Sequence, residues 1–401
     1  MYSHDALGLG HIRRSLAIAR AVLEARNDLA ALLLTCSPMV DALPSAPGLD
    51  YIKLPSAKKV ANREYVARTL PIGTDVFMNL RSALVRETAR HFDPDLFLVD
   101  KSPSGLMGEL RPTFQLLRER KTRPRTVLGL RDILDEPEAT REEWQAAGWV
   151  RFIERTYDEL WIYGDPDLFD APHAYAWPDW LVERVRYLGY LVNPVSDSER
   201  REARRQMGGD RRPLALVTVG GGEDGEHVIA TYLEAARRRL LPSDLKSVVV
   251  LGPCMPSAAQ SALREHPPPG VDVECFVPDL APSIAAADVV VGMAGYNTVC
   301  ELLAGRTPAI LAPRVKPRRE QWLRARALAE RGIAEYLEPD HLAPGALADA
   351  VRRALRRGRP QEGLPATDGL EQVARRVDEI LPGPAFRHFA AARSPEHVAY
   401  L

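Results

Sequence analysis

The hydrophobic and polar positions along the chain form a repeating order of short apolar runs, turns and amphipathic stretches. The apolar runs of the first half are continuous, which is typical of parallel strands covered on both faces. They predict strands over Leu29–Thr35, Leu49–Leu54, Asp95–Asp100, Thr126–Leu130, Glu159–Tyr163 and Val185–Leu188. The stretches between them predict helices over His11–Arg26, Asp75–His91, Ser104–Lys121 and Ala139–Thr156. This alternation predicts an α/β domain built on a parallel sheet.

The same pattern starts again in the second half of the chain. It predicts strands over Leu214–Val219, Ser247–Leu251, Val271–Phe276, Asp288–Gly292, Ala309–Ala312 and Ala334–Leu337. Helices are predicted over Gly225–Arg239, Tyr296–Gly305, Glu320–Arg331 and Gly345–Arg357. We therefore predict two Rossmann-like, doubly wound domains that face each other across a cleft.

Turn-forming residues indicate where these domains are divided. Asn193-Pro194 and Gly208-Gly209 flank a charged stretch, so we place a first domain at residues 1–190, a linker at 191–212 and a second domain at 213–380. The second domain includes a helix predicted over Gly369–Ile380, and we expect residues 381–401 to be a loosely ordered tail.

The beginning of the chain leaves little room for a first strand. A glycine motif at Gly8–His11 follows almost at once, so only about Met1–Ser3 can precede it in the sheet. Strands usually have five or six residues. We expect either a clipped first strand or a true start codon that lies upstream.

Composition and charge narrow the class of protein. Lys plus Arg (53) nearly cancel Asp plus Glu (54), a balance that argues against a dedicated nucleic-acid binder. There is no apolar run of 18 residues and no signal-peptide pattern at the N-terminus. The four cysteines are far apart, as expected for reduced thiols. We therefore expect a cytoplasmic protein.

The first candidate site joins the first strand to the first helix. Gly8 and Gly10 allow close approach of a ligand to the backbone, and the following helix start attracts anions. His11 would lie in the cleft at that helix start, where an imidazole can take a proton from a hydroxyl group, and Arg14 is a phosphate candidate. The alternative is a tight turn whose histidine only caps or packs.

Two further glycine turns follow strands of the second half. Gly220, Gly221 and Gly222 precede a helix and form the same kind of ligand-facing loop, or a merely flexible turn. The second turn, with Gly295, leads into a helix whose first amides, at Tyr296, Asn297 and Thr298, would hold a diphosphate.

Glu301 lies near the end of the first turn of that helix, where two interpretations compete. Its carboxylate can accept hydrogen bonds from a ribose diol, as acidic residues do in dinucleotide sites. Thr298 and Glu301 also have the spacing of a capping box, which is the better interpretation of these residues taken alone.

The loop after the strand at Ala309–Ala312 supplies more polar groups. Glu320 and Gln321 begin a helix and can bond sugar hydroxyls, although a solvated basic loop is the better interpretation of this segment taken alone. Arg131 leaves the sheet at the carboxyl edge and either faces the cleft or forms a surface ion pair. No segment has a convincing metal-ligand pattern, so we expect neither a metal nor a cofactor.

Taken in this order, the four sites resemble those of GT-B glycosyltransferases, and most of all the MurG-like group of glycosyltransferase family 28. The most specific part is Gly295–Glu301, followed by Pro308–Pro313 and Glu320-Gln321. The resemblance implies a GT-B fold and a nucleotide-sugar donor, most often a UDP-sugar, that is a substrate rather than a cofactor. It implies that His11 is the base and places Glu301 on the donor ribose, Tyr296–Thr298 near the diphosphate and Glu320 and Gln321 near the sugar, with Gly220–Gly222 lining the cleft.

The resemblance also implies an inverting, metal-independent transfer to an unidentified acceptor in the first domain, with possible peripheral contact to a membrane. Two departures keep other functions open. Gly10-His11-Ile12-Arg13-Arg14 is similar to the GHxxR segment of PseG-type nucleotide-sugar hydrolases of the same fold, in which the histidine acts on water. Glu320 stands where the MurG pattern has glutamine, which leaves the sugar open. A hydrolase, an epimerase and a non-catalytic nucleotide-sugar-binding protein are the alternatives.

Overall fold

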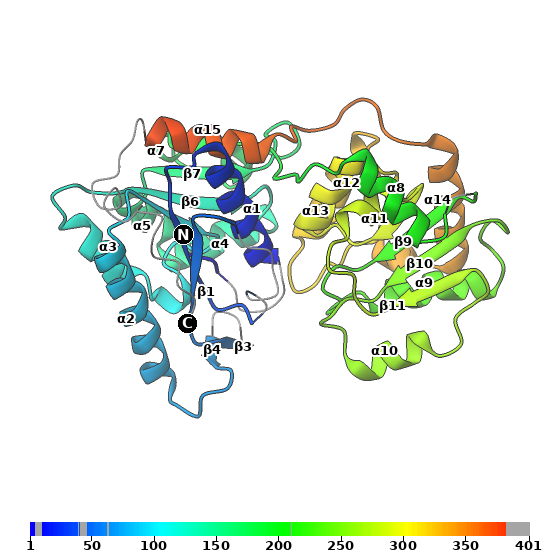
Figure 1. Ribbon diagram of the computed structural model, residues 1–401, viewed down its shortest axis with the longest axis horizontal. Helices are drawn as coiled ribbons and strands as arrows, with labels where there is room; N and C mark the ends of the chain where they lie inside the picture. The colour runs from blue at the N-terminus through cyan, green and yellow to red at the C-terminus, as the bar shows by residue number, and fades with distance from the viewer. Residues whose placement is uncertain (5–9, 39, 41–45, 62–63, 210, 382–401) are drawn as a thin grey trace, which may run out of the picture.

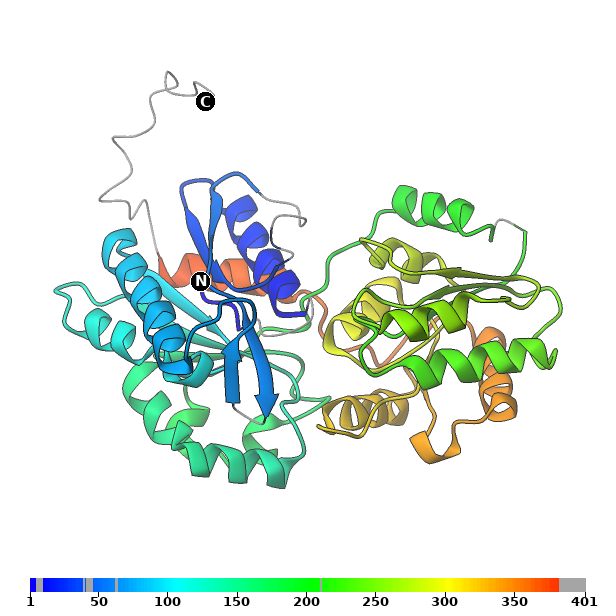
Figure 2. The ribbon, with the colours of Figure 1, turned by 90° about the horizontal axis from the view of Figure 1, so that it is seen from below.

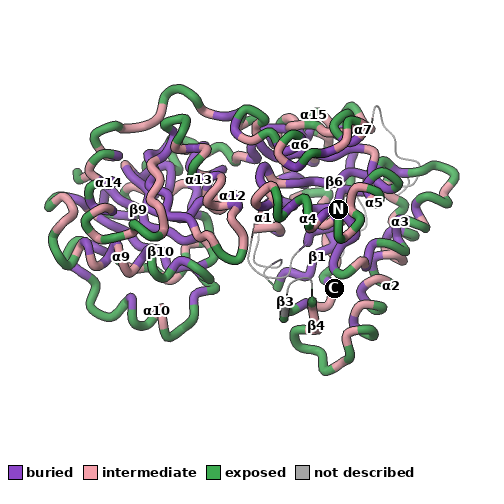
Figure 3. The backbone as a smooth tube through the Cα atoms, turned by 180° about the vertical axis from the view of Figure 1, so that it is seen from behind, coloured by how far each residue is buried: buried purple, intermediate pink, exposed green. Residues whose placement is uncertain are grey.

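The computed structural model describes residues 1–4, 10–38, 40, 46–61, 64–209 and 211–381. Gly8 and the predicted tail beyond residue 381 lie outside the described residues. The molecule has two lobes side by side, each built around a parallel sheet (Figures 1 and 2). The strands form the buried centre of each lobe, and exposed positions follow the outer helices (Figure 3).

The first sheet is parallel and has a very short central strand. β1 (Ala31–Thr35) pairs with β2 (Leu49–Lys53), and β5 (Leu96–Asp100), β6 (Arg125–Arg131), β7 (Glu159–Tyr163) and β8 (Val185–Tyr187) form a second ladder. Tyr2 joins the two ladders through parallel bridges to Leu34 and Val99. Tyr2 therefore lies between β1 and β5 in the middle of the first sheet.

The helices of the first lobe agree with the predicted order but not with every boundary. They are α1 (Gly10–Ala25), α2 (Thr74–Phe92), α3 (Arg111–Arg118), α4 (Pro137–Ala147), α5 (Trp149–Thr156), and the short α6 (Ala171–Ala174) and α7 (Asp179–Val182). The single helix predicted over Ala139–Thr156 is wrong, because Gly148 adopts φ +65° and ends α4. The helix predicted from Ser104 begins only at Arg111, because a loop and a 3-10 turn at Leu106–Gly108 precede it.

An antiparallel hairpin, β3 (Ala57–Ala61) and β4 (Glu64–Ala67), was not predicted. Its sequence is rich in charged residues and lacks a continuous apolar run. Such a strand pair gives no signal to a search for buried parallel strands.

The second sheet has the order β11-β10-β9-β12-β13-β14, and every pair in it is parallel. The strands are β9 (Leu214–Thr218), β10 (Lys246–Val250), β11 (Val271–Glu274), β12 (Val289–Gly292), β13 (Ala309–Leu311) and β14 (Glu335–Tyr336). The strand order reverses between β9 and β12, which is where doubly wound sheets open a crevice for ligands. The surrounding helices are α8 (Asp197–Gln206), α9 (Glu226–Arg237), α10 (Ser257–Arg264), α11 (Ala281–Ala286), α12 (Tyr296–Gly305), α13 (Glu320–Glu330) and α14 (Pro344–Arg357).

Two helices lie outside the domain predicted for them. α8, within the predicted linker, packs on α11 of the second lobe. α15 (Gly369–Ile380), predicted for the second domain, returns to the first lobe and lies along α1 (Figures 1 and 2). Its buried face, with Val373 and Val377, packs into the core that contains Ile18, and Arg376 pairs with Glu159 of β7. α15 packs on the first lobe because its amphipathic sequence forms an apolar stripe, and this stripe packs against α1.

No helix within the described parts of the chain is both long enough and apolar enough to cross a bilayer.

Candidate active site

A cleft of about 220 Å³ lies between the two lobes at the carboxyl ends of both sheets. The structure brings most of the predicted site residues into its wall: Gly10, His11, Arg14, Arg131, Gly220, Gly221, Gly295, Tyr296, Asn297, Thr298, Glu301 and Gln321. They come from loops and helix starts far apart in the sequence. These residues meet because the carboxyl ends of the strands of both parallel sheets face the same cleft.

His11 is oriented by a buried carboxylate at the end of β5. Its Nδ1 lies 2.6 Å from Asp100 Oδ2, and Arg14 binds Oδ1 of the same carboxylate through Nε at 3.0 Å and Nη2 at 2.5 Å. Because an ionised carboxylate only accepts hydrogen bonds, Nδ1 carries the proton of the His11–Asp100 bond, and Arg14 Nη2, which also lies 2.9 Å from Nδ1, donates to Asp100 Oδ1. The other ring nitrogen, Nε2, is then the basic one.

The protonation states fit a base that is neutral at physiological pH. Burial lowers the pKa of His11 to about 3, more than the neighbouring Asp100 raises it. Burial alone would raise the pKa of Asp100, but the charge of Arg14 and the hydrogen bonds from His11 and Arg14 hold it well below its usual range. Asp100 therefore stays ionised while His11 stays uncharged.

The glycines of the second lobe have different parts in the turn after β9. Gly220 adopts φ +66° and lines the cleft together with Gly221. Gly222 adopts φ +91°, and a Cβ there would lie 2.6 Å from the carbonyl oxygen of Leu251. Gly222 is thus a packing glycine of the turn and does not line the cleft, contrary to its predicted place.

The start of α12 faces α1 across the cleft. Its N-cap is Gly295, and no side chain caps it, so the amides of its first turn are available to a ligand. Asn297 donates from Nδ2 to the carbonyl oxygen of Gly10 at 3.3 Å, which links the two lobes directly. Tyr296 is buried and stacks on Tyr190 with ring centroids 5.8 Å apart, so it supports the helix start from behind.

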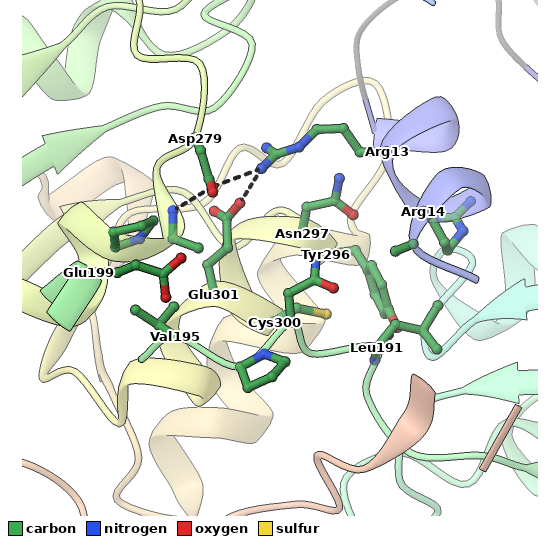
Figure 4. Close-up of a pocket in the computed structure, with 15 residues that line it drawn as sticks. Arg13, Arg14, Leu191, Val195, Glu199, Asp279, Tyr296, Asn297, Cys300 and Glu301 are labelled. Atoms are coloured by element: carbon green, nitrogen blue, oxygen red, sulfur yellow. Dashed lines mark hydrogen bonds and ion pairs between the residues drawn. The ribbon is translucent and has the colours of Figure 1, made fainter. Parts of the chain in front are cut away.

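Glu301 lies in the second turn of α12, not the first, and takes no part in a capping box. Its Oε1 accepts a hydrogen bond from Arg13 Nη2 at 2.8 Å, and the same Arg13 nitrogen lies 3.9 Å from Asp279 Oδ1 (Figure 4). Burial raises the pKa of Glu301, and the charge of Arg13 opposes this shift. The carboxylate is therefore presented to the cleft and is held by a cation of the opposite lobe.

The two predicted sugar-binding residues at the start of α13 are separated. Gln321 lines the cleft, and its buried Oε1 has no hydrogen-bond partner. Glu320 is buried behind the wall, where its Oε1 accepts from Arg314 Nη2 at 2.8 Å while Oε2 has no partner. Burial would raise its pKa, but Arg131 and Arg314 lower it. Only Gln321 of this pair is placed to touch a ligand directly.

Sequence analysis missed three features of the site. The first is Asp100, whose role could have been predicted because it is the last residue of a buried strand, at the edge of the sheet where ligands bind. Arg13 lies within the quoted glycine-histidine segment but was not assigned a role. A fully buried ion pair joins the lobes, with Arg324 Nε and Nη2 at 2.8 and 2.7 Å from the two oxygens of Asp132. No signal in one sequence pairs residues 192 positions apart.

Within the described residues, no three or more His, Cys, Asp and Glu side chains are grouped as metal ligands. Arg131 was predicted either to face the cleft or to form a surface ion pair. It lines the cleft, and its buried Nε has no hydrogen-bond partner.

Comparisons with known proteins agree with this geometry. Residues 216–375 match the family model described as glycosyltransferase family 28 C-terminal domain. Two curated relatives are named UDP-N-acetylglucosamine–N-acetylmuramyl-(pentapeptide) pyrophosphoryl-undecaprenol N-acetylglucosamine transferase. The one from Halorhodospira halophila is 27% identical over 51% of this chain and 59% of its own length. The one from Histophilus somni is 31% identical over 34% of this chain and 39% of its own. The chain thus spans less than two thirds of the length of these curated relatives.

Solved structures extend the likeness to the whole fold. The glycotransferase of kitacinnamycin superimposes with a TM-score of 0.57 at 17% identity, covering 92% of both chains. MurG of Acinetobacter baumannii superimposes with a TM-score of 0.55 at 15% identity, covering 95% of this chain and 98% of its own. The protein has a GT-B fold, and residues 216–375 of its second lobe match the model of the glycosyltransferase family 28 C-terminal domain.

Proposed function

We propose that this protein is a glycosyltransferase that moves a sugar from a nucleotide-sugar donor, a UDP-sugar, to an acceptor bound by the first lobe. One observation carries the proposal. In a GT-B fold, His11 with its Asp100 partner shares a single cleft with the glycine turn after β9 and the start of α12. A base and a diphosphate-binding surface on opposite walls are what transfer from a nucleotide-sugar requires.

His11 takes the proton of the attacking acceptor through Nε2, and Asp100 keeps the ring in the tautomer that makes this possible. Attack from the first lobe, opposite the departing diphosphate, inverts the anomeric carbon. The uncapped amides of α12 stabilise the diphosphate as charge develops on it. Arg14 is committed to Asp100 and is a positioning residue rather than a phosphate ligand.

The Glu301 carboxylate accepts hydrogen bonds from the hydroxyl groups of the donor ribose. In the structure Arg13 donates a hydrogen bond to this carboxylate. Donor binding therefore replaces the Arg13 hydrogen bond with hydrogen bonds from the ribose. The released guanidinium lies beside the donor site, where it is placed to counter phosphate charge. Gln321, which lines the cleft, contacts the sugar, and no metal is needed in this scheme.

The names of the relatives support a proposal for the nucleotide and for contact with membranes. Their printed names include UDP-N-acetylglucosamine and a pyrophosphoryl-undecaprenol acceptor, which supports uridine as the base of the donor. We infer a cytoplasmic protein with peripheral contact to membranes. Sedimentation with anionic vesicles, against neutral ones, tests that contact.

A turnover assay tests the proposal. UDP release from UDP-sugars is measured with and without a crude acceptor extract, in EDTA, for the wild type and His11→Ala. We expect acceptor-dependent release that falls about 10²–10⁴-fold in the variant. Acceptor-independent release of free sugar would instead identify a hydrolase, which the same His11–Asp100 pair suits equally well. Full activity of His11→Ala would contradict the assigned base.

A further inference from the structure

The turn that leads into α12 has a glycine at each end. Gly292 is the last residue of β12 and Gly295 is the N-cap of α12, with Met293 and Ala294 between them. The amides that follow this turn are the ones that we assign to the donor diphosphate. A displacement of about 1 Å in such a site can cost about 10²-fold in function. The groups that fix this turn therefore matter for the donor site.

Arg324 of α13 binds this turn from within the protein. Its Nη1 donates to the carbonyl oxygen of Ala294 at 2.7 Å, while Nε and Nη2 donate to the two carboxylate oxygens of Asp132. All three residues are buried. Asp132 directly follows β6, so the guanidinium joins the donor turn of the second lobe to the end of a strand in the first lobe.

Tyr190 connects the same carboxylate to the place where the chain crosses between the lobes. Its hydroxyl group donates to Asp132 Oδ2 at 2.7 Å. Its backbone pairs with the returning chain, because its amide donates to the carbonyl oxygen of Ala366 at 2.8 Å and its carbonyl oxygen accepts from the Gly369 amide at 3.1 Å. Both crossings of the chain are therefore attached to Asp132 through the side chain of Tyr190.

The ring of Tyr190 extends this connection to the start of α12. It stacks on the ring of Tyr296, the first residue of that helix, with centroids 5.8 Å apart and planes 22° apart. The Leu191 amide donates to the Tyr296 hydroxyl oxygen at 3.4 Å, and Figure 4 shows these two residues next to each other. The guanidinium carbon of Arg324 lies 5.9 Å from the centroid of the Tyr296 ring.

We propose that Arg324 and Tyr190 are positioning residues of the donor site. They hold the first turn of α12, through Ala294 and Tyr296, against Asp132 of the first lobe. The affinity for a nucleoside diphosphate then depends on the contact between the two lobes. Both residues are fully buried, so they act on the donor through the turn and not by touching it. The inference rests on the proposed function for the identity of the ligand, and the positioning itself is argued from these contacts.

Fixing geometry is the role that suits a buried ionic group. A buried ion pair is often no more stabilising than a packed apolar pair of similar volume, because both charges lose their hydration. Its hydrogen bonds have fixed directions, and the planar guanidinium binds the Asp132 carboxylate and the Ala294 carbonyl group at the same time. A lysine ammonium group does not present this fork. Arg324→Lys therefore keeps a positive charge beside Asp132 but loses the shared geometry.

Arg324→Lys and Tyr190→Phe test the inference, because both keep the charge and most of the packing around Asp132. Isothermal titration measures the binding of UDP, and ligand-observed NMR measures the binding of uridine, which lacks the diphosphate. We expect UDP to bind at least tenfold more weakly to Arg324→Lys and at least threefold more weakly to Tyr190→Phe, with uridine within twofold of the wild type for both. Arg326→Lys, at an exposed position of the same helix, is the matched control and should bind both ligands like the wild type.

Amide hydrogen exchange supplies a readout that needs no ligand. We expect the segment 293–303 to exchange faster in Arg324→Lys than in the wild type. The strand β10 of the same sheet is the internal reference, and its exchange should not change. A variant that only loosened the whole lobe would raise the exchange rate of both segments.

Binding of UDP to both variants as tightly as to the wild type would overturn the inference and leave the proposed function standing. An equal loss of UDP and uridine affinity, or faster exchange in β10 as well, would also overturn it, because the variant would then loosen the lobe as a whole. If the wild type bound no UDP while the exchange of 293–303 still responded to Arg324→Lys and not to Arg326→Lys, the proposed function would be contradicted and the role of Arg324 in holding the turn would be supported.

Discussion

At the residue scale, the chemistry of the cleft depends on two charges that are buried together. Asp100 is 7% exposed and Arg14 is 5% exposed, and each supplies the partner that the other needs. Burial of the ring keeps the pKa of His11 below the physiological range, although the Asp100 carboxylate that holds its proton raises that pKa. His11 is thus a neutral base in a fixed tautomer.

Asp100→Asn tests the role of this carboxylate. The amide keeps the size of the side chain but lets His11 adopt the other tautomer, so we expect kcat to fall about 10²–10⁴-fold with little change in the KM of the donor. Steady-state kinetics give both constants. A kcat within threefold of the wild type would show that His11 needs no such orientation.

The pH dependence gives a second prediction. The pKa of His11 is about 3 in the folded protein and about 6.5 in an unfolded chain, so the folded state binds fewer protons between these values. The stability contributed by this difference is complete above about pH 6.5 and is lost as pH falls toward 3. NMR of labelled histidine should show no titration of His11 between pH 8 and 5, with the urea-unfolded chain as reference. A midpoint near 6.5 in the folded protein would contradict the burial argument.

At the element scale, the site depends on where strands end and helices begin. The continuous apolar runs predicted nearly all strands of both sheets, because burial on both faces imposes that pattern. The break at Gly148 and the hairpin β3–β4 gave no comparable signal, since one is a single backbone angle and the other is a polar pair. The glycine turns were predicted, but only the structure separates the packing role of Gly222 from the cleft roles of Gly220 and Gly221.

For side chains too, the sequence predicted some features of the site and only the structure shows the others. The sequence allowed both a capping box and a ligand role for Glu301, and the contact with Arg13 removes the first. Long-range pairs such as Arg324 with Asp132 depend on tertiary packing, which local patterns do not encode.

The buried pair of Arg324 and Asp132 should stabilise the contact between the end of β6 and α13. Arg324→Met leaves Asp132 charged and without its main partner, so we expect the free energy of unfolding to fall by about 3–5 kcal/mol. Urea denaturation measures the change. Arg326→Met is the matched control on the same helix. Arg326 is exposed, where it pairs with Glu330 and lies over the ring of Trp322, so the change in stability should be less than about 1 kcal/mol. If both variants lowered the free energy of unfolding equally, the buried pair would contribute no more to stability than the exposed one.

At the scale of the whole molecule, the chain crosses between the lobes twice. It leaves the first lobe after β8, builds the second, and returns through α15, which packs on α1 (Figure 2). The helix that carries His11 therefore has the cleft at its start and α15 along its side. The last described helix supports the first lobe although its sequence neighbours belong to the second.

Val377→Asp tests this support. A carboxylate placed at a position only 3% exposed should lower stability by about 3 kcal/mol, or roughly 6–12 °C in the Tm of the first lobe. Differential scanning calorimetry records the transition. Glu371→Gln, an exposed position on the same helix, is the control and should leave the Tm within about 1 °C. An unchanged Tm for Val377→Asp would mean that α15 does not stabilise the first lobe.

The most direct test of the account is a binding measurement with UDP, TDP, GDP and CMP on the wild type and Glu301→Ala, with the exposed Glu330→Ala as control. Thermal shift reports the stabilisation, which is about 2.7 kcal/mol at a ligand concentration of 100 Kd. We predict that UDP stabilises the wild type most and that Glu301→Ala binds it about 10–100-fold more weakly, the loss expected for hydrogen bonds to a charged group. A folded protein that no nucleotide stabilises, or that binds UDP equally well without the Glu301 carboxylate, would contradict the proposed donor site.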